Sequence, residues 1–225
     1  MQQGQATGRD VAKHEGIALM RATVIDYKAG NLTSVLKSLR HMGAEVEVTD
    51  SDLTMVEHAE RLVLPGVGHF SAAERLDATG LTGAIRAAIA RGVPFLGICV
   101  GMQWLYAGST EAPQQPGLGH FSESCTRFPD GTEKVPHVGW NSLEVRAGSR
   151  LLEGVAPGEF VYFTHSYKAP ISTDTAATTT YIEPFASAVE RGNVMGVQFH
   201  PEKSGEAGLK ILRNFLRWNP KEAGC

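Results

Sequence analysis

The stretch VPFLGICVGMQ at residues 93–103 decides how the rest of the chain is interpreted. It is an apolar run that leads to Cys99, with a glycine two residues to either side. This pattern is typical of a nucleophile elbow, in which a buried strand turns sharply into a helix and glycines let neighbouring backbone approach the strained turn. A lone cysteine beside glycines is more often an inert core residue. Taken alone, the stretch leaves both interpretations open.

A second stretch, VQFHPE at residues 197–202, contains the side chains that a cysteine nucleophile requires. His200 and Glu202 lie two apart in a run that we expect to be extended, which would place both side chains on one face. Pro201 favours this conformation at His200, because a residue before proline is disfavoured in the helical region. With both stretches in this order, each after an apolar strand, a Cys99–His200–Glu202 triad becomes the preferred interpretation.

Composition narrows the class of protein. The chain has 225 residues, of which 42% are hydrophobic, and we expect a polar tail over residues 1–20 and one globular domain over residues 21–219. A net charge of −3 without a basic block argues against nucleic-acid partners, and no apolar run is long enough to span a membrane. Three scattered cysteines, Cys99, Cys125 and Cys225, suit free thiols in a reducing cytoplasm rather than a disulfide framework. The roles of Cys125 and Cys225 stay open.

The order of expected elements predicts an α/β fold. In the first half, strands alternate with helices, which indicates a single-domain, doubly wound, mainly parallel sheet flanked by helices. The second half contains short runs typical of strands, which favours an antiparallel or mixed extension of the same sheet, covered by a final helix at residues 209–216. Residues 172–180, rich in Thr and Ala, are interpreted as a surface loop or edge. The expected strands are residues 22–27, 45–49, 61–64, 95–98, 120–128, 138–145, 160–167, 178–182 and 194–199, and the expected helices of the first half are residues 32–39 and 81–90.

The two opening stretches resemble those of glutamine amidotransferases with a cysteine triad, and the resemblance covers about residues 22–218. KVPHVGWN at residues 134–141 and YFTHSY at residues 162–167 are similar to the glutaminase subunits of imidazole glycerol phosphate synthases. The chain departs from this pattern at Lys28, where the family usually has glycine, and at residues 119–123, which lack the usual apolar character. Neither departure touches the expected triad.

The resemblance implies an activity and a partner. The chain would hydrolyse L-glutamine to glutamate and ammonia, and would pass the ammonia to a TIM-barrel cyclase in a heterodimer that makes imidazole glycerol phosphate for histidine biosynthesis. No cofactor is implied, and the histidines show no spacing typical of a metal site. Two alternatives remain: a stand-alone cysteine hydrolase of γ-glutamyl compounds, and a catalytically silent subunit kept for assembly.

The expected oxyanion hole has two parts. One donor is the backbone N–H of Val100, directly after the nucleophile, and the other comes from the loop Gly66, Val67 and Gly68. The same loop could be an ordinary strand-to-helix turn. Because its glycines let a peptide turn over at small cost, we expect one of its donors to point away from Cys99 in the chain without a partner.

The resemblance also assigns substrate contacts and a partner interface. Glu111 could instead be a solvated loop charge, and the interface residues could be ordinary amphipathic aromatics with a solvated lysine. The implied substrate contacts are Gln103, Glu111, Ser166 and Tyr167, and the implied interface residues are Trp140, Tyr162 and Lys203.

Overall fold

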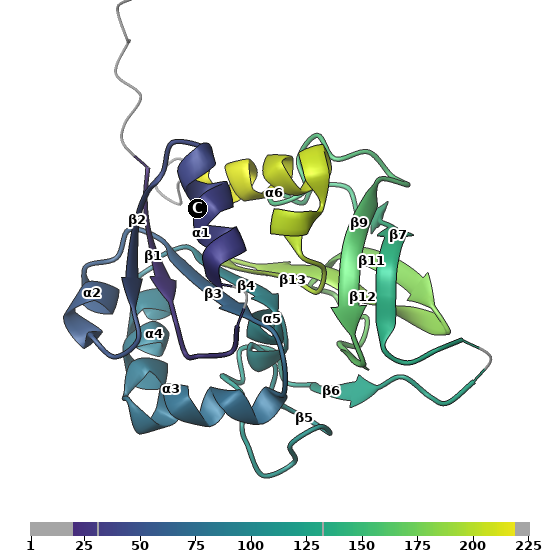
Figure 1. Ribbon diagram of the computed structural model, residues 1–225, viewed down its shortest axis with the longest axis horizontal. Coiled ribbons are helices and arrows are strands. Elements are labelled where there is room, and N and C mark those ends of the chain that lie inside the picture. The colour runs from purple at the N-terminus through teal and green to yellow at the C-terminus, as the bar shows by residue number, and fades with distance from the viewer. Residues whose placement is uncertain (1–19, 31, 132, 219–225) are drawn as a thin grey trace, which may run out of the picture.

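A computed structural model describes residues 20–30, 32–131 and 133–218. Its centre is an eight-stranded sheet in the order β2-β1-β3-β4-β13-β12-β11-β8 (Figure 1). The first five strands in this order are parallel, and the remaining pairings are antiparallel. The strands of this sheet are β1 (Arg21–Ile25), β2 (Glu45–Thr49), β3 (Leu62–Gly66), β4 (Phe95–Cys99), β8 (Glu144–Val145), β11 (Thr175–Tyr181), β12 (Glu183–Arg191) and β13 (Val194–Val197).

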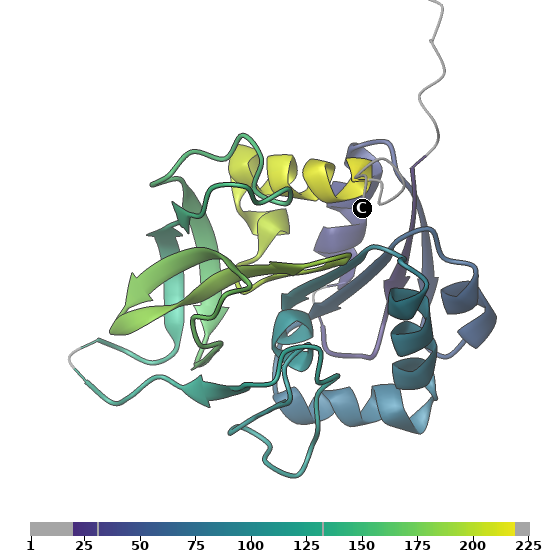
Figure 2. The ribbon, with the colours of Figure 1, turned by 180° about the vertical axis from the view of Figure 1, so that it is seen from behind.

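Helices cover both faces of the sheet. Helices α1 and α6 lie on one face, and α3, α4 and α5 lie on the other (Figures 1 and 2). In α1, Val35 and Leu39 are buried four residues apart, which is the spacing of one helical face. The helices are α1 (Leu32–His41), α2 (Leu53–Glu57), α3 (Glu74–Ala78), α4 (Leu81–Ala90), α5 (Val100–Trp104) and α6 (Gly205–Arg217), with short 3₁₀ helices η1 (Phe70–Ala73) and η2 (Pro201–Lys203).

Two small sheets complete the second half of the chain. One has the order β10-β6-β5, and the other pairs β7 with β9. The predicted fold class, a mainly parallel doubly wound sheet with a mixed extension, is confirmed. The expectation that all strands of the second half extend the same sheet is wrong, because β6, β7, β9 and β10 lie in these separate sheets. The strands of the small sheets are β5 (Gly108–Ser109), β6 (Ser124–Arg127), β7 (His137–Ser142), β9 (Phe160–His165) and β10 (Tyr167–Lys168).

Another expectation about the fold is wrong in part. Residues 172–174 do form a turn, but residues 175–180 are no surface loop or edge, because they belong to β11, which lies inside the sheet between β12 and β8. Its alanines and threonines have small or β-branched side chains that fit between neighbouring strands, and Ala177 and Thr179 are each 1% exposed. Strand β12 was not expected at all, since Pro184 and charged residues at its ends interrupt the apolar pattern.

The described residues leave most of the two chain ends out, so they test few of the expectations about those ends. The elements run from Arg21 to Arg217. Of the polar tail expected over residues 1–20, only Met20 is among the described residues. Cys225 also lies outside them. The expected domain boundaries therefore stay a prediction. Within the described part of the chain, every helix is too short or too polar to cross a bilayer.

Candidate active site

The turn after β4 has the geometry of a nucleophile elbow. Cys99 ends a fully buried strand with φ = 54° and ψ = −109°, a region that L-residues rarely occupy and that costs about 1–3 kcal/mol. A Cβ at Gly97 would lie under 3.0 Å from the Gly101 backbone, and one at Gly101 under 3.0 Å from the Leu64 carbonyl of β3. Both flanking glycines are therefore required sterically, as the sequence pattern predicts.

His200 and Glu202 meet directly after β13. His200 Nδ1 lies 2.8 Å from Glu202 Oε1, and both side chains are fully buried. His200 is extended (φ = −99°, ψ = 94°), as the following proline predicts. Glu202, however, lies in the 3₁₀ turn η2, so the expectation that one extended segment presents both side chains is wrong. The turn itself brings the carboxylate back to the imidazole.

The electrostatics of His200 connect it to Cys99. Burial lowers the pKa of His200, but the hydrogen-bonding and charge interactions with Cys99 and Glu202 raise it more, to about 9. A protonated imidazole at neutral pH is the partner that a cysteine thiolate requires. The structure thus places the three residues of the expected triad together, and the arrangement can hold a thiolate–imidazolium pair.

A cavity of about 230 Å³ opens beside the Cys99 sulfur. All four residues expected to contact the substrate line it. Glu111 is more than a solvated loop charge, because its Oε2 accepts a hydrogen bond from the Phe70 N–H at 2.8 Å. The residues that line the cavity are Val67, Gly68, Cys99, Val100, Gln103, Glu111, Pro136, Thr164, His165, Ser166 and Tyr167.

A fully buried residue in contact with Gln103, Gln198, is one that the sequence analysis missed. Gln103 Nε2 donates to the Tyr167 carbonyl at 3.0 Å and to Gln198 Oε1 at 3.1 Å. Gln198 Nε2 in turn lies 3.6 Å from Cys99 Sγ. One signal could have identified Gln198: it is a polar residue between Val197 and Phe199, in the apolar run that leads to His200.

The expected oxyanion loop lies at the edge of the cavity. The Val67 N–H donates to the Ala29 carbonyl at 2.6 Å, so this donor is engaged by the loop after β1. Gly68 has φ = 116°, which is accessible to glycine at little cost. The Tyr27 hydroxyl occupies the space where a Cβ of Gly66 would lie. The loop is therefore held in a conformation in which one of its N–H groups serves another acceptor.

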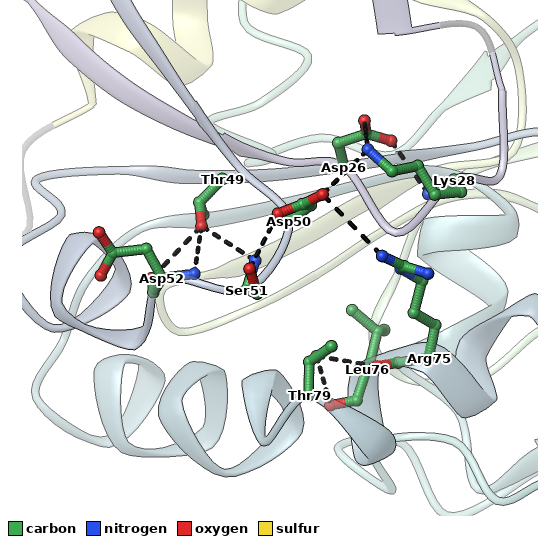
Figure 3. Close-up of polar contacts among 9 residues, drawn as sticks. All are labelled: Asp26, Lys28, Thr49, Asp50, Ser51, Asp52, Arg75, Leu76 and Thr79. Carbon is green, nitrogen blue, oxygen red and sulfur yellow. Dashed lines mark hydrogen bonds and ion pairs between the residues drawn. The ribbon is translucent and has the colours of Figure 1, made fainter.

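The loop after β1 is itself anchored through Lys28 (Figure 3). Lys28 adopts φ = 64°, the conformation for which glycine is the usual residue. Its backbone N–H donates to Asp26 Oδ1 at 3.0 Å, and its Nζ lies 2.7 Å from Asp26 and 3.1 Å from Asp50. Arg75 of α3 lies 3.9 Å from Asp50. Lys28, at the position where the family usually has glycine, is thus held by local hydrogen bonds and ion pairs.

The three residues expected at a partner interface are also adjacent. Trp140 of β7 pairs with Tyr162 of β9, with ring centroids 6.1 Å apart, and Lys203 Nζ lies 5.6 Å from the Tyr162 ring. Beside them, Val138 and Phe160 are 57% and 58% exposed. We call Val138, Trp140, Phe160, Tyr162 and Lys203 the β7–β9 patch. Exposed apolar groups of this kind mark interaction sites.

Across residues 20–30, 32–131 and 133–218, the His, Cys, Asp and Glu side chains form no group of three suited to a metal ion.

Comparisons with known proteins agree with this geometry. The family model "Glutamine amidotransferase class-I" matches residues 23–218. The chain is 47% identical over 198 residues to the imidazole glycerol phosphate synthase subunit HisH of Deinococcus radiodurans, covering 86% of this chain and 92% of that one. It is 48% identical over 195 residues to HisH of Methanothermobacter thermautotrophicus, covering 86% and 96%.

Solved structures support the fold. A crystal structure of a glutamine amidotransferase aligns with a TM-score of 0.69 and 20% identity, covering 87% of this chain and 96% of that one. A PurLQS structure from Thermotoga maritima aligns with a TM-score of 0.66 and 22% identity, covering 87% and 97%. The chain belongs to the class-I glutamine amidotransferase family and, within it, to the HisH subunits of imidazole glycerol phosphate synthase.

Proposed function

We propose that this chain hydrolyses L-glutamine through Cys99, His200 and Glu202 and delivers the ammonia to a TIM-barrel cyclase that makes imidazole glycerol phosphate in histidine biosynthesis. The observation that carries the proposal is the strained Cys99 turn at a cavity, with a buried His200–Glu202 pair that interacts with the sulfur. A cysteine thiolate beside an imidazolium suits an amide substrate, since amides require a strong nucleophile and an acid for the leaving group.

The reaction divides into two steps. The Cys99 thiolate attacks the side-chain amide carbon, and the His200 imidazolium gives its proton to the departing ammonia, which leaves a γ-glutamyl thioester. His200, now neutral, takes a proton from water, and the resulting hydroxide attacks the thioester and releases glutamate and the thiolate. Glu202 accepts the Nδ1 hydrogen bond throughout, which keeps the imidazole oriented and stabilises its charged form.

Substrate recognition is assigned to the polar wall of the cavity. Gln103 and Glu111 present oxygen acceptors suited to an α-ammonium group, while the backbone around Ser166 and Tyr167 suits an α-carboxylate. Because Gln103 uses its Nε2 for Tyr167 and Gln198, its Oε1 is the atom available to a substrate.

The oxyanion loop supports a gating proposal. Val100 N–H and one N–H of the 66–68 loop would stabilise the tetrahedral intermediate, each contributing on the order of 3 kcal/mol. Because the Val67 N–H is bound to the Ala29 carbonyl, this donor is withheld from the hole in the resting chain. A docked partner would favour the turned peptide, and the activation can be no larger than the partner's differential affinity for the two states.

The β7–β9 patch is the proposed docking surface for the cyclase. It is continuous with the catalytic centre, because the His200 N–H donates to the Tyr162 carbonyl at 2.8 Å. The Tyr162 N–H donates to Ser204 Oγ at 3.0 Å, and Ser204 Oγ donates to the His200 carbonyl at 2.6 Å. A partner seated on Tyr162 therefore contacts the backbone that holds His200.

The test is glutamate formation by the purified chain, alone and with a TIM-barrel cyclase and its nucleotide ligand. We expect little hydrolysis by the chain alone and a large increase in the complex. Cys99→Ala is the control and should bind the partner without hydrolysis. Full activity without a partner would favour a stand-alone hydrolase of γ-glutamyl compounds. No activity in the assembled complex would indicate a catalytically silent subunit.

A further inference from the structure

Beside Cys99 lies a buried amide that the mechanism above does not use. Gln198 follows β13, its side chain is fully buried, and its Nε2 lies 3.6 Å from Cys99 Sγ. We propose that Gln198 is a further catalytic residue, whose side-chain N–H donates a hydrogen bond to the Cys99 thiolate. The inference rests on the proposed function, because it assigns Cys99 as the nucleophile.

The neighbouring hydrogen bonds fix which end of the Gln198 amide faces the sulfur. A glutamine oxygen and nitrogen are distinguished by their partners, and a backbone carbonyl can only accept. The Tyr167 carbonyl therefore requires the Nε2 of Gln103, which lies at 3.0 Å. The second N–H of the same Nε2 requires an acceptor at 3.1 Å, which is Gln198 Oε1. The donor end of Gln198 is left to face Cys99.

The Tyr167 carbonyl is held in place from its other side. His165 Nδ1 lies 2.8 Å from this carbonyl, and His165 Nε2 lies 3.1 Å from His137 Nδ1. Burial lowers the pKa of His165 to about 3 and that of His137 to about 4, so both rings are neutral near neutral pH. Each neutral ring has one N–H, and the carbonyl requires the His165 proton on Nδ1. The hydrogen bonds from His137 through His165 to the Tyr167 carbonyl, and from Gln103 to the same carbonyl, can therefore all form at once with Gln198 Nε2 toward Cys99.

Besides His200, one acceptor and one donor lie beside the sulfur, and the protonation of Cys99 decides which of them it can bind. As a thiol, Cys99 reaches the Thr164 carbonyl at 4.0 Å. As a thiolate it can only accept, and Gln198 is the buried amide donor beside it. Hydrogen bonds to a charged acceptor are about twice as strong as neutral ones. Gln198 therefore favours the thiolate in the resting enzyme and stabilises it again when it leaves the thioester.

Several ionisable groups lie near the same sulfur or line its cavity, and they enter any pH measurement on it. His200, directly before η2, interacts with the sulfur, and Glu202 of η2 is paired with His200. Tyr27 lies close enough for the charge of Cys99 to add to the effect of burial, which raises the pKa of its phenol. Glu111 and His165 line the cavity. Replacement of Gln198 leaves all five in place, so a difference between variants reports on the amide.

The test is the pH dependence of Cys99 alkylation by iodoacetamide in the full chain, read by mass spectrometry of the Cys99 peptide. Gln198→Met keeps the volume and removes the donor, and Gln198→Glu keeps the shape but presents a carboxylate. Ser187→Ala is the matched control, because Ser187 is equally buried on the neighbouring strand β12 and its hydroxyl makes no hydrogen bond within the described residues. Cys125 is fully buried, and burial raises the pKa of its thiol, so it reacts slowly.

We expect the alkylation midpoint to rise by about one pH unit in Gln198→Met, a tenfold loss of thiolate at fixed pH, and further in Gln198→Glu. Ser187→Ala should leave it unchanged. An unchanged midpoint in a folded Gln198→Met variant would overturn the proposal. If the variants do not fold, the ¹⁵N resonance of the Gln198 amide in the unmodified chain decides: it should move as Cys99 ionises, and no movement refutes the hydrogen bond. Retained glutaminase activity in Cys99→Ala would instead overturn the proposed function.

Discussion

The contact between Gly66 and Tyr27 yields a prediction that can be worked from the structure. A Cβ at Gly66 would lie 2.9 Å from Tyr27 Cζ and 3.1 Å from Val100 Cβ, and closer still to the Tyr27 hydroxyl. The Tyr27 ring is 1% exposed, so it has little room to move aside. Gly66→Ala should therefore lower the free energy of unfolding by about 1–3 kcal/mol, the usual cost of overpacking a core. The displaced loop should also reduce glutamine hydrolysis.

A double-mutant cycle measured by urea unfolding tests this reasoning. The Tyr27 hydroxyl makes no hydrogen bond with the residues that the structure describes, so Tyr27→Phe alone should cost little. It should recover part of the loss in Gly66→Ala, with a coupling energy of about 0.5–3 kcal/mol. Gly83→Ala on α4 is the control, since its Cβ would meet nothing within 4 Å, and it should stabilise the helix by about 0.5–1 kcal/mol. Strict additivity of the two substitutions would refute the steric account.

Further predictions concern the proposed triad and the elbow. Cys99→Ala should abolish glutamine hydrolysis in the complex while retaining the thermal unfolding midpoint, and any catalytic turnover would contradict the assignment. His200→Asn should be nearly as damaging. Glu202→Gln should reduce kcat less, by on the order of 100-fold, because the imidazole of His200 stays partly oriented without the charge of the carboxylate. Equal losses of kcat in steady-state assays would give Glu202 a larger role. The kcat/KM of the complex should fall as pH rises through about 9, because His200 then loses the proton that it gives to the departing ammonia. In Glu202→Gln the fall should move to lower pH, because the carboxylate no longer raises the pKa of His200. An unmoved pH profile would exclude this role for the carboxylate. Gly101→Ala should destabilise the chain more than Gly66→Ala in urea, because its Cβ meets the Leu64 backbone, which cannot rotate away.

The sequence predicts the elbow well because its constraint is local. Gly97 and Gly101 are close to Cys99 in the chain, and their lack of a Cβ is what the tight turn requires. The parallel half of the sheet could be predicted for a similar reason, since each strand and helix has its own apolar pattern. The same locality explains why His200 and Glu202 could be paired, although the turn that joins them was expected to be extended chain.

Features that depend on distant pairing could not be predicted. The contact of Gln198 with Cys99 exists because β13 lies beside β4, with Val197 paired to Ile98. The Val67–Ala29 hydrogen bond likewise requires the loops after β1 and β3 to meet. Residues 175–177 of β11 and the burial of the whole strand were missed, because that burial comes from neighbours on both sides and a run of alanine and threonine has no apolar pattern of its own.

Covalent labelling tests the central claim, that Cys99 is the nucleophile for glutamine, most directly. A glutamine analogue with a diazoketone in place of the side-chain amide alkylates the residue that attacks that position. After incubation of the complex with this analogue, peptide mass spectrometry should place the label on Cys99, and excess L-glutamine should protect it. Label on another residue, or labelling and loss of activity that persist in Cys99→Ala, would contradict the account.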